Sequence, residues 1–256
     1  DTSLQIFREF IEQAKERWQS LVESELANEY PNRYSRGVWT ASYQIIGDIQ
    51  SIPLPQFKAV LDQVKGNETG WPPWWVPTRR EIAPYVFNEL IECWLKDTYS
   101  VDGAHSDFWR ASPSGLMFLL RGYQEDSEAK GVEPGTIFDL TLPVWRTGEC
   151  LLHAERLSRT IASDQQTLVR FQTTWTGLKG RVLKSWANPR RHLAGDRIAR
   201  QDTLTSEIVV QADSISTSLP EIVQSITKPL YALFDFFDPP MEMFHDELSR
   251  MKSGRE

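Results

Sequence analysis

The sequence predicts an α+β fold: a small sheet, mixed or mainly antiparallel, packed with several helices, with a helix at each end of the chain. Stretches in which apolar and polar residues alternate, the pattern of half-buried strands, occur between stretches with the helical period. Prolines, glycines and asparagines separate the two kinds of stretch, as expected at turns.

Several segments are predicted to be helical, beginning at the N-terminus. Residues 3–27 place apolar residues at alternating spacings of three and four, and Ser3 or Thr2 can cap this helix. Residues 141–161 form the clearest helix, with Pro143 tolerated in its first turn. The other predicted helices are a short one ending near Val64, one over residues 218–237 kinked at Pro229, and a last one over residues 241–251.

Strands are predicted where apolar and polar residues alternate, over residues 39–45, 87–95, 114–123, 168–174 and 202–212. The second and third of these are expected to pair in an antiparallel sheet. A length of 256 residues allows one large domain or two small ones. We therefore expect either a helical and strand segment over residues 1–66 followed by an α+β domain over residues 67–256, or one continuous domain.

Composition and charge bound the class of protein. The longest apolar runs fall far short of the roughly 20 residues that span a bilayer, so no membrane segment is predicted. Only two cysteines occur, Cys93 and Cys150, without the spacing of a zinc or redox pair. This usage favours a reducing compartment, and we expect a cytoplasmic protein. Because the chain starts at Asp1 and opens directly into a helical pattern, we expect it to be the C-terminal part of a longer protein.

Residues 69–77 (TGWPPWWVP) predict a rigid aromatic loop. Its prolines prevent a regular strand ladder, and Trp71, Trp74 and Trp75 need burial or a ligand. Together with Trp109 they are candidate ligand-binding residues, since indoles stack on flat ligands or bases. The alternative is that this loop is a lid over the domain's own core.

A polar stripe runs along the helix predicted over residues 141–161. Arg146, Glu149, His153 and Arg156 recur at spacings of three, four and three, opposite the apolar face. Such a stripe is usually a solvated face with ion pairs inside the helix. If another part of the chain covers it, the stripe becomes a pocket for an anion or an amide, with Arg146, Glu149 and His153 as ligand-binding residues.

A second polar cluster, Arg121 to Asp126, follows the strand over residues 114–123. Strand ends lead into loops, which often carry function, so Arg121 and Glu125 are also candidate ligand-binding residues. Arg121 has two open interpretations: it pairs with Glu149 as a structural contact, or it holds an anionic ligand.

The net charge of −7 argues against general coating of nucleic acid, but the charge is unevenly distributed. One stretch has only Asp196 as an acidic residue and seven basic ones: Lys179, Arg181, Lys184, Arg190, Arg191, Arg197 and Arg200. Such a basic stretch can attract phosphate, which makes a nucleic-acid-binding element an alternative function. The simpler interpretation is a solvated loop neutralised by the acidic remainder of the chain.

Known catalytic patterns are missing from the sequence. It contains no phosphate-binding glycine loop, dinucleotide fingerprint, zincin histidine pair or nucleophile elbow. We therefore predict no catalytic residue, no metal site and no cofactor. A divergent nuclease or hydrolase that uses His105, Asp107 or Glu125 is a further alternative, which requires a geometry that the sequence does not give.

Several phrases of the sequence resemble a known bacterial family. They are "GWPPWW", "IECWL", "DFWRASPSGLMFLLRGYQED", "FDLTLPVWRTGECLLHAERLSRT", "FQTTWTGLKGR" and "ITKPLYALFDFFDPP". They look like the region that follows an AlbA-type (Schlafen-like) domain in proteins labelled transcriptional regulators or ATP-binding proteins. The AlbA-like domain itself is absent from this sequence. The resemblance implies an accessory region without an active site, which senses or recruits for the neighbouring domain.

Together these observations predict a non-enzymatic ligand-sensing or protein-interaction module of a larger bacterial regulatory or defence-type protein. The expected partners are the preceding domain of the same chain and, through the apolar seams over residues 4–21 and 219–237, a second copy in a homodimer.

Overall fold

A computed structural model describes residues 1–26, 36–95 and 103–254. Its centre is one antiparallel sheet in the order β2-β3-β4-β5-β1-β7-β9. The strands are β1 Val38–Ile46, β2 Tyr85–Phe87, β3 Leu90–Trp94, β4 Asp107–Ser112, β5 Leu116–Gly122, β7 Leu168–Trp175 and β9 Leu204–Gln211. The predicted α+β class with a mainly antiparallel sheet is therefore confirmed.

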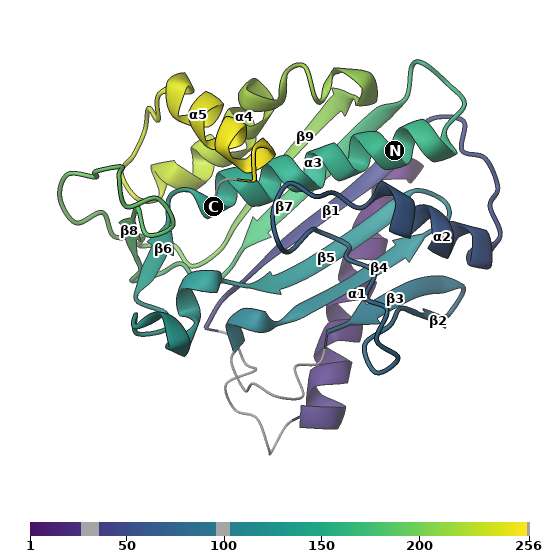
Figure 1. The fold of residues 1–256 in the computed structure, drawn as a ribbon, viewed down its shortest axis with the longest axis horizontal. Coiled ribbons are helices and arrows are strands. Elements are labelled where there is room, and N and C mark those ends of the chain that lie inside the picture. Colours follow the sequence, from purple (N-terminus) through teal and green to yellow (C-terminus); the bar gives the residue numbers. More distant parts are fainter. Residues whose placement is uncertain (27–35, 96–102, 255–256) are drawn as a thin grey trace.

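Helices cover both faces of this sheet (Figure 1). Helix α1 lies behind the sheet, while α3 crosses its front, with α4 and α5 beside α3 and α2 near the other end of the front face. The helices are α1 Thr2–Leu26, α2 Leu54–Val64, α3 Leu142–Ile161, α4 Leu219–Ala232 and α5 Met241–Lys252. In the described part of the chain, no helix is long and apolar enough to cross a bilayer.

Strand β1 connects the two segments, residues 1–66 and 67–256, that were predicted either as separate or as one continuous domain. It pairs with β5 on one side and with β7 on the other. Alternate residues of β1 face the two layers: Trp39, Ala41 and Tyr43 belong to the core under α3, and the residues between them face the side of α1. Residues 1–66 and 67–256 thus build one sheet.

Helix α1 packs against the opposite face of the sheet. Its buried side chains, among them Phe7, Ile11 and Ala14, form a second core with Phe108 of β4 and Phe118 of β5. The apolar seam over residues 4–21 is therefore used inside the chain. The stripe on α4 is used in the same way, because Leu219, Val223, Ile226 and Leu230 are buried in the core under α3. These seams no longer favour a dimer, which stays an untested prediction.

The segment predicted as one strand over residues 87–95 is a hairpin instead. Strands β2 and β3 are joined at Asn88 and Glu89, which both have positive φ, 48° and 62°. Two consecutive residues with positive φ form the turn that fits the twist of a two-residue hairpin. Because glutamate is unusual at the second position of such a turn, the sequence carries no signal for it.

Strand β4 was also missed, because the polar residues His105, Ser106 and Asp107 precede and begin it in the sequence. In the structure β4 pairs with both β3 and β5, and all of its residues except Ser112 are buried. A strand buried on both faces lacks the alternation of apolar and polar residues that marks a half-buried one. Its charged residues are instead paired: Asp107 contacts Arg121, and Arg110 contacts Glu92.

Two further differences concern the C-terminal half. Helix α4 ends at Ala232, before the predicted end at 237, and Asp235 has a positive φ of 55° in the loop that follows. A small parallel pair, β6 Ile137–Asp139 and β8 Val182–Lys184, lies beside the N-terminus of α3 (Figure 1). Both strands of this pair are three residues long, too short for a periodic signal.

Candidate ligand-binding cleft

A row of directly paired residues crosses the sheet and forms the floor of a cleft. Asp107 of β4 lies opposite Arg121 of β5, Arg121 lies opposite Trp39 of β1, and Trp39 lies opposite Trp175 of β7. Side chains at directly opposed positions project to the same face of a sheet. The row therefore places a charged pair beside two indoles under the N-terminal turns of α3.

The walls of this cleft come from the turn after β5, from β6 and from the start of α3. Five aromatic residues line it, together with the polar side chains of Arg121, Gln124, Glu125 and Arg146. The aromatic residues are Trp39, Trp71, Tyr123, Phe138 and Trp175. The cavity volume is about 20 Å³, room for roughly one water molecule. The cleft thus admits a small group and, as it stands, has no space for a flat ring.

Arg121 is held on every side by groups of the chain. It is 1% exposed, and its Nε donates to Oδ2 of Asp107 at 2.9 Å. Its two other nitrogens donate to the carbonyl oxygens of Trp71 and Pro72 at 2.9 and 2.6 Å, and its guanidinium lies 4.4 Å from the Trp71 ring centre. Of the two open interpretations of Arg121, the pairing with Glu149 is therefore wrong, since Asp107 is the partner.

Arg146 and Glu149 form a second buried pair, one helical turn apart on α3. Nη1 of Arg146 donates to Oε2 of Glu149 at 2.7 Å, and the Thr69 hydroxyl donates to the other carboxylate oxygen. Nη2 of Arg146 donates to Oε1 of Gln124 at 2.8 Å, which ties α3 to the turn after β5. We call the pairs Asp107–Arg121 and Arg146–Glu149 the paired wall. Its two positive and two negative charges cancel.

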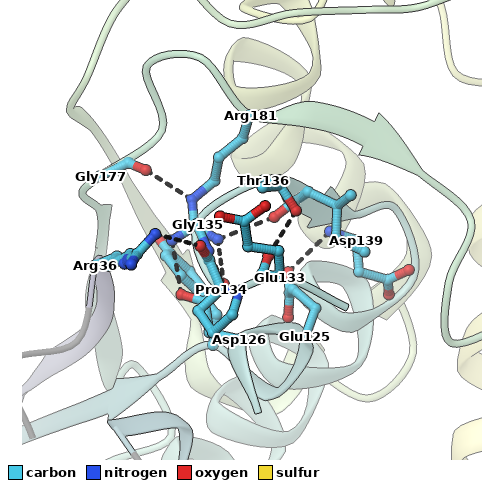
Figure 2. A network of polar contacts seen from close by, with 12 residues as sticks. Arg36, Glu125, Asp126, Glu133, Pro134, Gly135, Thr136, Asp139, Gly177 and Arg181 are labelled. Atoms are coloured by element: carbon cyan, nitrogen blue, oxygen red, sulfur yellow. Dashed lines mark hydrogen bonds and ion pairs between the residues drawn. The ribbon is translucent and has the colours of Figure 1, made fainter. Parts of the chain in front are cut away.

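Glu125, which lines the cleft, belongs to a buried acidic group. Asp126 and Asp139 are buried near it, and Arg181 is the guanidinium beside them (Figure 2). We call these four residues the acidic wall. It holds three carboxyl groups against one guanidinium, so that its charge is −2 when all four are ionised.

Two of these carboxyl groups have specific partners. Asp126 accepts two hydrogen bonds from Arg181, at 2.6 and 2.7 Å, and Arg181 also donates to the Gly177 and Ile137 carbonyls (Figure 2). Asp139 accepts four backbone hydrogen bonds, from Thr141 and Leu142 at the start of α3 and from Trp186 and Ala187 after β8. Burial raises the pKa of Asp139, and these four hydrogen bonds oppose that shift without cancelling it.

Glu125 is the carboxyl group without a cation. It is 2% exposed, and its Oε1 accepts one hydrogen bond from the backbone N–H of Asp139 at 2.8 Å. In the described part of the chain it makes no ion pair. Burial, and then the charge of Asp139, raise the pKa of Glu125 to about 8. Near neutral pH this carboxyl group is therefore largely protonated.

The loop over residues 127–136 borders the acidic wall. Asp126 accepts a hydrogen bond from the Gly135 N–H at 3.0 Å, and Arg36 donates to the Pro134 carbonyl at 2.9 Å (Figure 2). Ala129 and Lys130 within this loop are exposed. The loop is thus bonded to the acidic wall through Asp126 and to the segment before β1 through Arg36.

The structure brings some of the predicted ligand-binding residues together and separates others. Trp71, Arg121, Glu125 and Arg146 line the cleft. Trp74, Trp109 and His153 are fully buried in the core instead. Glu149 does not line the cleft but pairs with Arg146, which does. Trp75 lies on the aromatic loop, and its carbonyl oxygen accepts a hydrogen bond from the indole of Trp109 at 2.9 Å.

Trp74 and His153 belong to one buried cluster. The indole of Trp74 donates to the Phe118 carbonyl at 3.1 Å, and its ring centre lies 4.7 Å from that of His153. Nδ1 of His153 forms a 2.8 Å hydrogen bond with the Tyr43 hydroxyl, while its Nε2 has no partner. Burial lowers the pKa of His153 to about 3, which keeps the imidazole neutral. The polar stripe is therefore covered rather than solvated.

Most of the basic stretch is engaged with other residues of the chain. Arg181 binds Asp126, Arg191 contacts Glu247, Lys184 contacts Asp196, and Arg197 donates to the carbonyl of Asp235. The exposed side chains of Lys179, Arg190 and Arg200 make no ion pair with a described residue. The cationic surface is thus much smaller than the sequence indicates.

The residues of the nuclease or hydrolase alternative do not form an acid–base pair. His105 is exposed, whereas Asp107 is fully buried and bound to Arg121. Among the described residues, no group of three histidine, cysteine or acidic side chains has the geometry of a metal site.

Sequence reasoning missed several residues of the cleft. Trp39 and Trp175 look like ordinary core positions of strands, and Phe138 belongs to the strand that was too short to detect. Asp139 had a usable signal, because an aspartate shortly before a helix start is typical of a capping residue. Its contact with Glu125 depends on the tertiary fold.

Comparisons of the chain with protein-family models, curated proteins and solved structures find no match. The resemblance to the region that follows AlbA-type domains therefore stays a prediction, and the cleft itself carries the functional argument.

Proposed function

We propose that this chain is a non-enzymatic module that binds a small ligand in the cleft at the N-terminus of α3. The observation that carries the proposal is the convergence of Trp71, Arg121, Glu125 and Arg146 on one cleft from three separate parts of the chain. Ligand sites typically combine apolar walls with a few placed polar groups, and this cleft has that composition.

The position of the cleft supports a sensing role. It lies where the turn after β5, strand β6 and the first turns of α3 meet, and Asp139 at the end of β6 connects these elements through its hydrogen bonds. A group that enters the cleft contacts all three elements, so its binding favours one arrangement of them. In a larger bacterial regulatory or defence-type protein, we propose that this effect is passed to a neighbouring domain.

An NMR fragment screen tests the proposal, with a variant that fills the cleft and a matched control. Thr173 lines the cleft, whereas its neighbour Thr174 faces the opposite side of the sheet. We expect fragments to shift indole resonances in the wild type and in Thr174→Leu, and to lose this effect in Thr173→Leu. Melting temperatures of both variants check that each is folded. If no fragment binds the wild type, or if Thr173→Leu binds as well as the wild type, the proposed function is wrong.

A further inference from the structure

Building on the proposed function, we infer that the cleft binds a cationic group, namely the primary ammonium end of an amine, through the carboxylate of Glu125 and the surrounding aromatic rings. The charges around the cleft, the aromatic rings that line it and the size of its cavity all favour an ammonium group as the ligand.

The charge balance of the cleft leaves one carboxyl group unpaired. The guanidinium of Arg121 is held by Asp107, and that of Arg146 by Glu149, so the paired wall offers no free positive charge to an anion. The anion pocket expected for a covered polar stripe is therefore not favoured, because the stripe supplies its own carboxylate. Glu125 is the lining residue whose charge has no counterpart.

The charged groups near Glu125 make its ionised form unfavourable unless a cation is bound. Asp139 donates its backbone N–H to Glu125 but also brings a carboxylate near it, and Asp126 adds another. Arg181 is the nearby guanidinium, and Asp126 occupies two of its nitrogens. An ionised Glu125 thus lies in a buried region with excess negative charge, which attracts an ammonium group.

The aromatic lining suits the same ligand. Indole and phenol faces attract cations, and several rings around one point form the cage that recognises ammonium groups. Two rings already show this behaviour toward arginine: Arg121 lies over Trp71 at 4.4 Å, and Arg181 lies over Tyr123 at 4.7 Å. Trp39 and Trp175 lie opposite each other on the sheet and also line the cleft, so their indole rings can contact the bound ammonium group.

The cavity volume selects the size of the group. About 20 Å³ holds an ammonium head group but excludes a nucleobase or another flat ring. The remainder of the ligand must then lie outside this cavity. We therefore identify the ligand class as a flexible amine with a terminal ammonium group.

Binding of a cation is coupled to loss of the Glu125 proton. Because the pKa of Glu125 is about 8 in the free protein, an ammonium ligand displaces this proton when it binds near neutral pH. The apparent affinity should rise about tenfold for each pH unit up to that pKa and then level off, since the carboxylate is the binding form. Calorimetry in buffers of different ionisation enthalpy should record release of nearly one proton at pH 6.5.

The experiment uses three probes of similar size: butylammonium, butanol and butyrate. Their binding to the wild type, Glu125→Gln and Thr174→Leu is measured by NMR shifts of the indole groups. We expect butylammonium to bind the wild type and the control most tightly and to lose about tenfold or more in affinity in Glu125→Gln. Melting temperatures confirm that Glu125→Gln is folded.

Two other outcomes separate this inference from the proposed function. If butanol or butyrate binds the cleft as tightly as butylammonium, or if Glu125→Gln leaves the affinity for butylammonium unchanged, the cation inference is overturned while the cleft remains a ligand site. If none of the probes binds and the fragment screen is also empty, both the inference and the proposed function fail.

Discussion

The paired wall and the acidic wall differ in how many guanidinium groups neutralise their buried carboxyl groups. In the paired wall, each guanidinium meets one carboxylate at 2.9 or 2.7 Å. In the acidic wall, three carboxyl groups share one guanidinium, and Glu125 responds with a raised pKa. Burial raises the pKa of Asp107 as well, but Asp107 and Glu149 each have their own guanidinium, whereas Glu125 has none among the described residues.

The largest effect is expected where a pair is broken. Arg121→Ala leaves Asp107, which is fully buried, without its cation. We expect the free energy of unfolding to fall by about 3–5 kcal/mol, because an uncompensated buried charge is costly. Urea unfolding measures this change. Lys15→Ala is the control: its pair with Glu12 is on the surface, with 38% of the lysine and 66% of the glutamate side chain exposed, and the expected loss is below about 1 kcal/mol. Equal losses in both variants would contradict the role of the paired wall.

The second prediction concerns the guanidinium of the acidic wall. Arg181→Ala should lower the free energy of unfolding by about 3 kcal/mol at neutral pH. This loss should be larger at pH 9 than at neutral pH, because Glu125, whose pKa is about 8, is then ionised beside the missing guanidinium. Urea unfolding at several pH values tests this. A loss that is independent of pH would mean that Arg181 acts through packing alone.

The third prediction follows from the pKa of Glu125. Its folded value of about 8 lies above its ordinary value of 4.5, so the folded state holds the proton more tightly. The stabilising contribution is complete below about pH 4.5 and is lost as the pH rises to 8. Glu125→Gln removes this dependence, and we expect it to raise the free energy of unfolding by about 1–2 kcal/mol at pH 8.5. If the variant is less stable than the wild type at that pH, the carboxyl group is compensated after all.

The smallest effect is expected outside both walls, in the basic stretch. Arg190→Ala combined with Arg200→Ala should change the free energy of unfolding by less than about 0.5 kcal/mol, because both side chains are exposed. We also expect no retardation of short DNA or RNA by the wild type at moderate salt. Salt-sensitive binding that this double variant abolishes would instead favour the nucleic-acid alternative.

Local periodicity was enough to predict the fold class, but not the charged parts of the fold. Helix α3 was predicted within one residue of its start, because Thr141 and Pro143 mark its beginning and its apolar face has a clear period. Strand β4 was missed because its buried charges, Asp107 and Arg110, satisfy their partners on neighbouring strands. Partners distant in sequence leave no local pattern.

The cleft shows the same limit. Arg121, Glu125 and Arg146 were found as candidates because polar residues at a strand end and on a helix stand out locally. Their interpretation was open, since the sequence does not tell which carboxylate meets which guanidinium. The structure assigns Asp107 to Arg121 and Glu149 to Arg146. Glu125 is distinguished only by the absence of such a partner among the described residues.

The most direct test of this account is the titration of the Glu125 carboxyl carbon by NMR, with Glu125→Gln to assign its resonance. We expect a midpoint near 8 in the free protein and a lower midpoint when butylammonium is bound. A midpoint near the ordinary glutamate value of 4.5 would show that the acidic wall is compensated and would contradict the account.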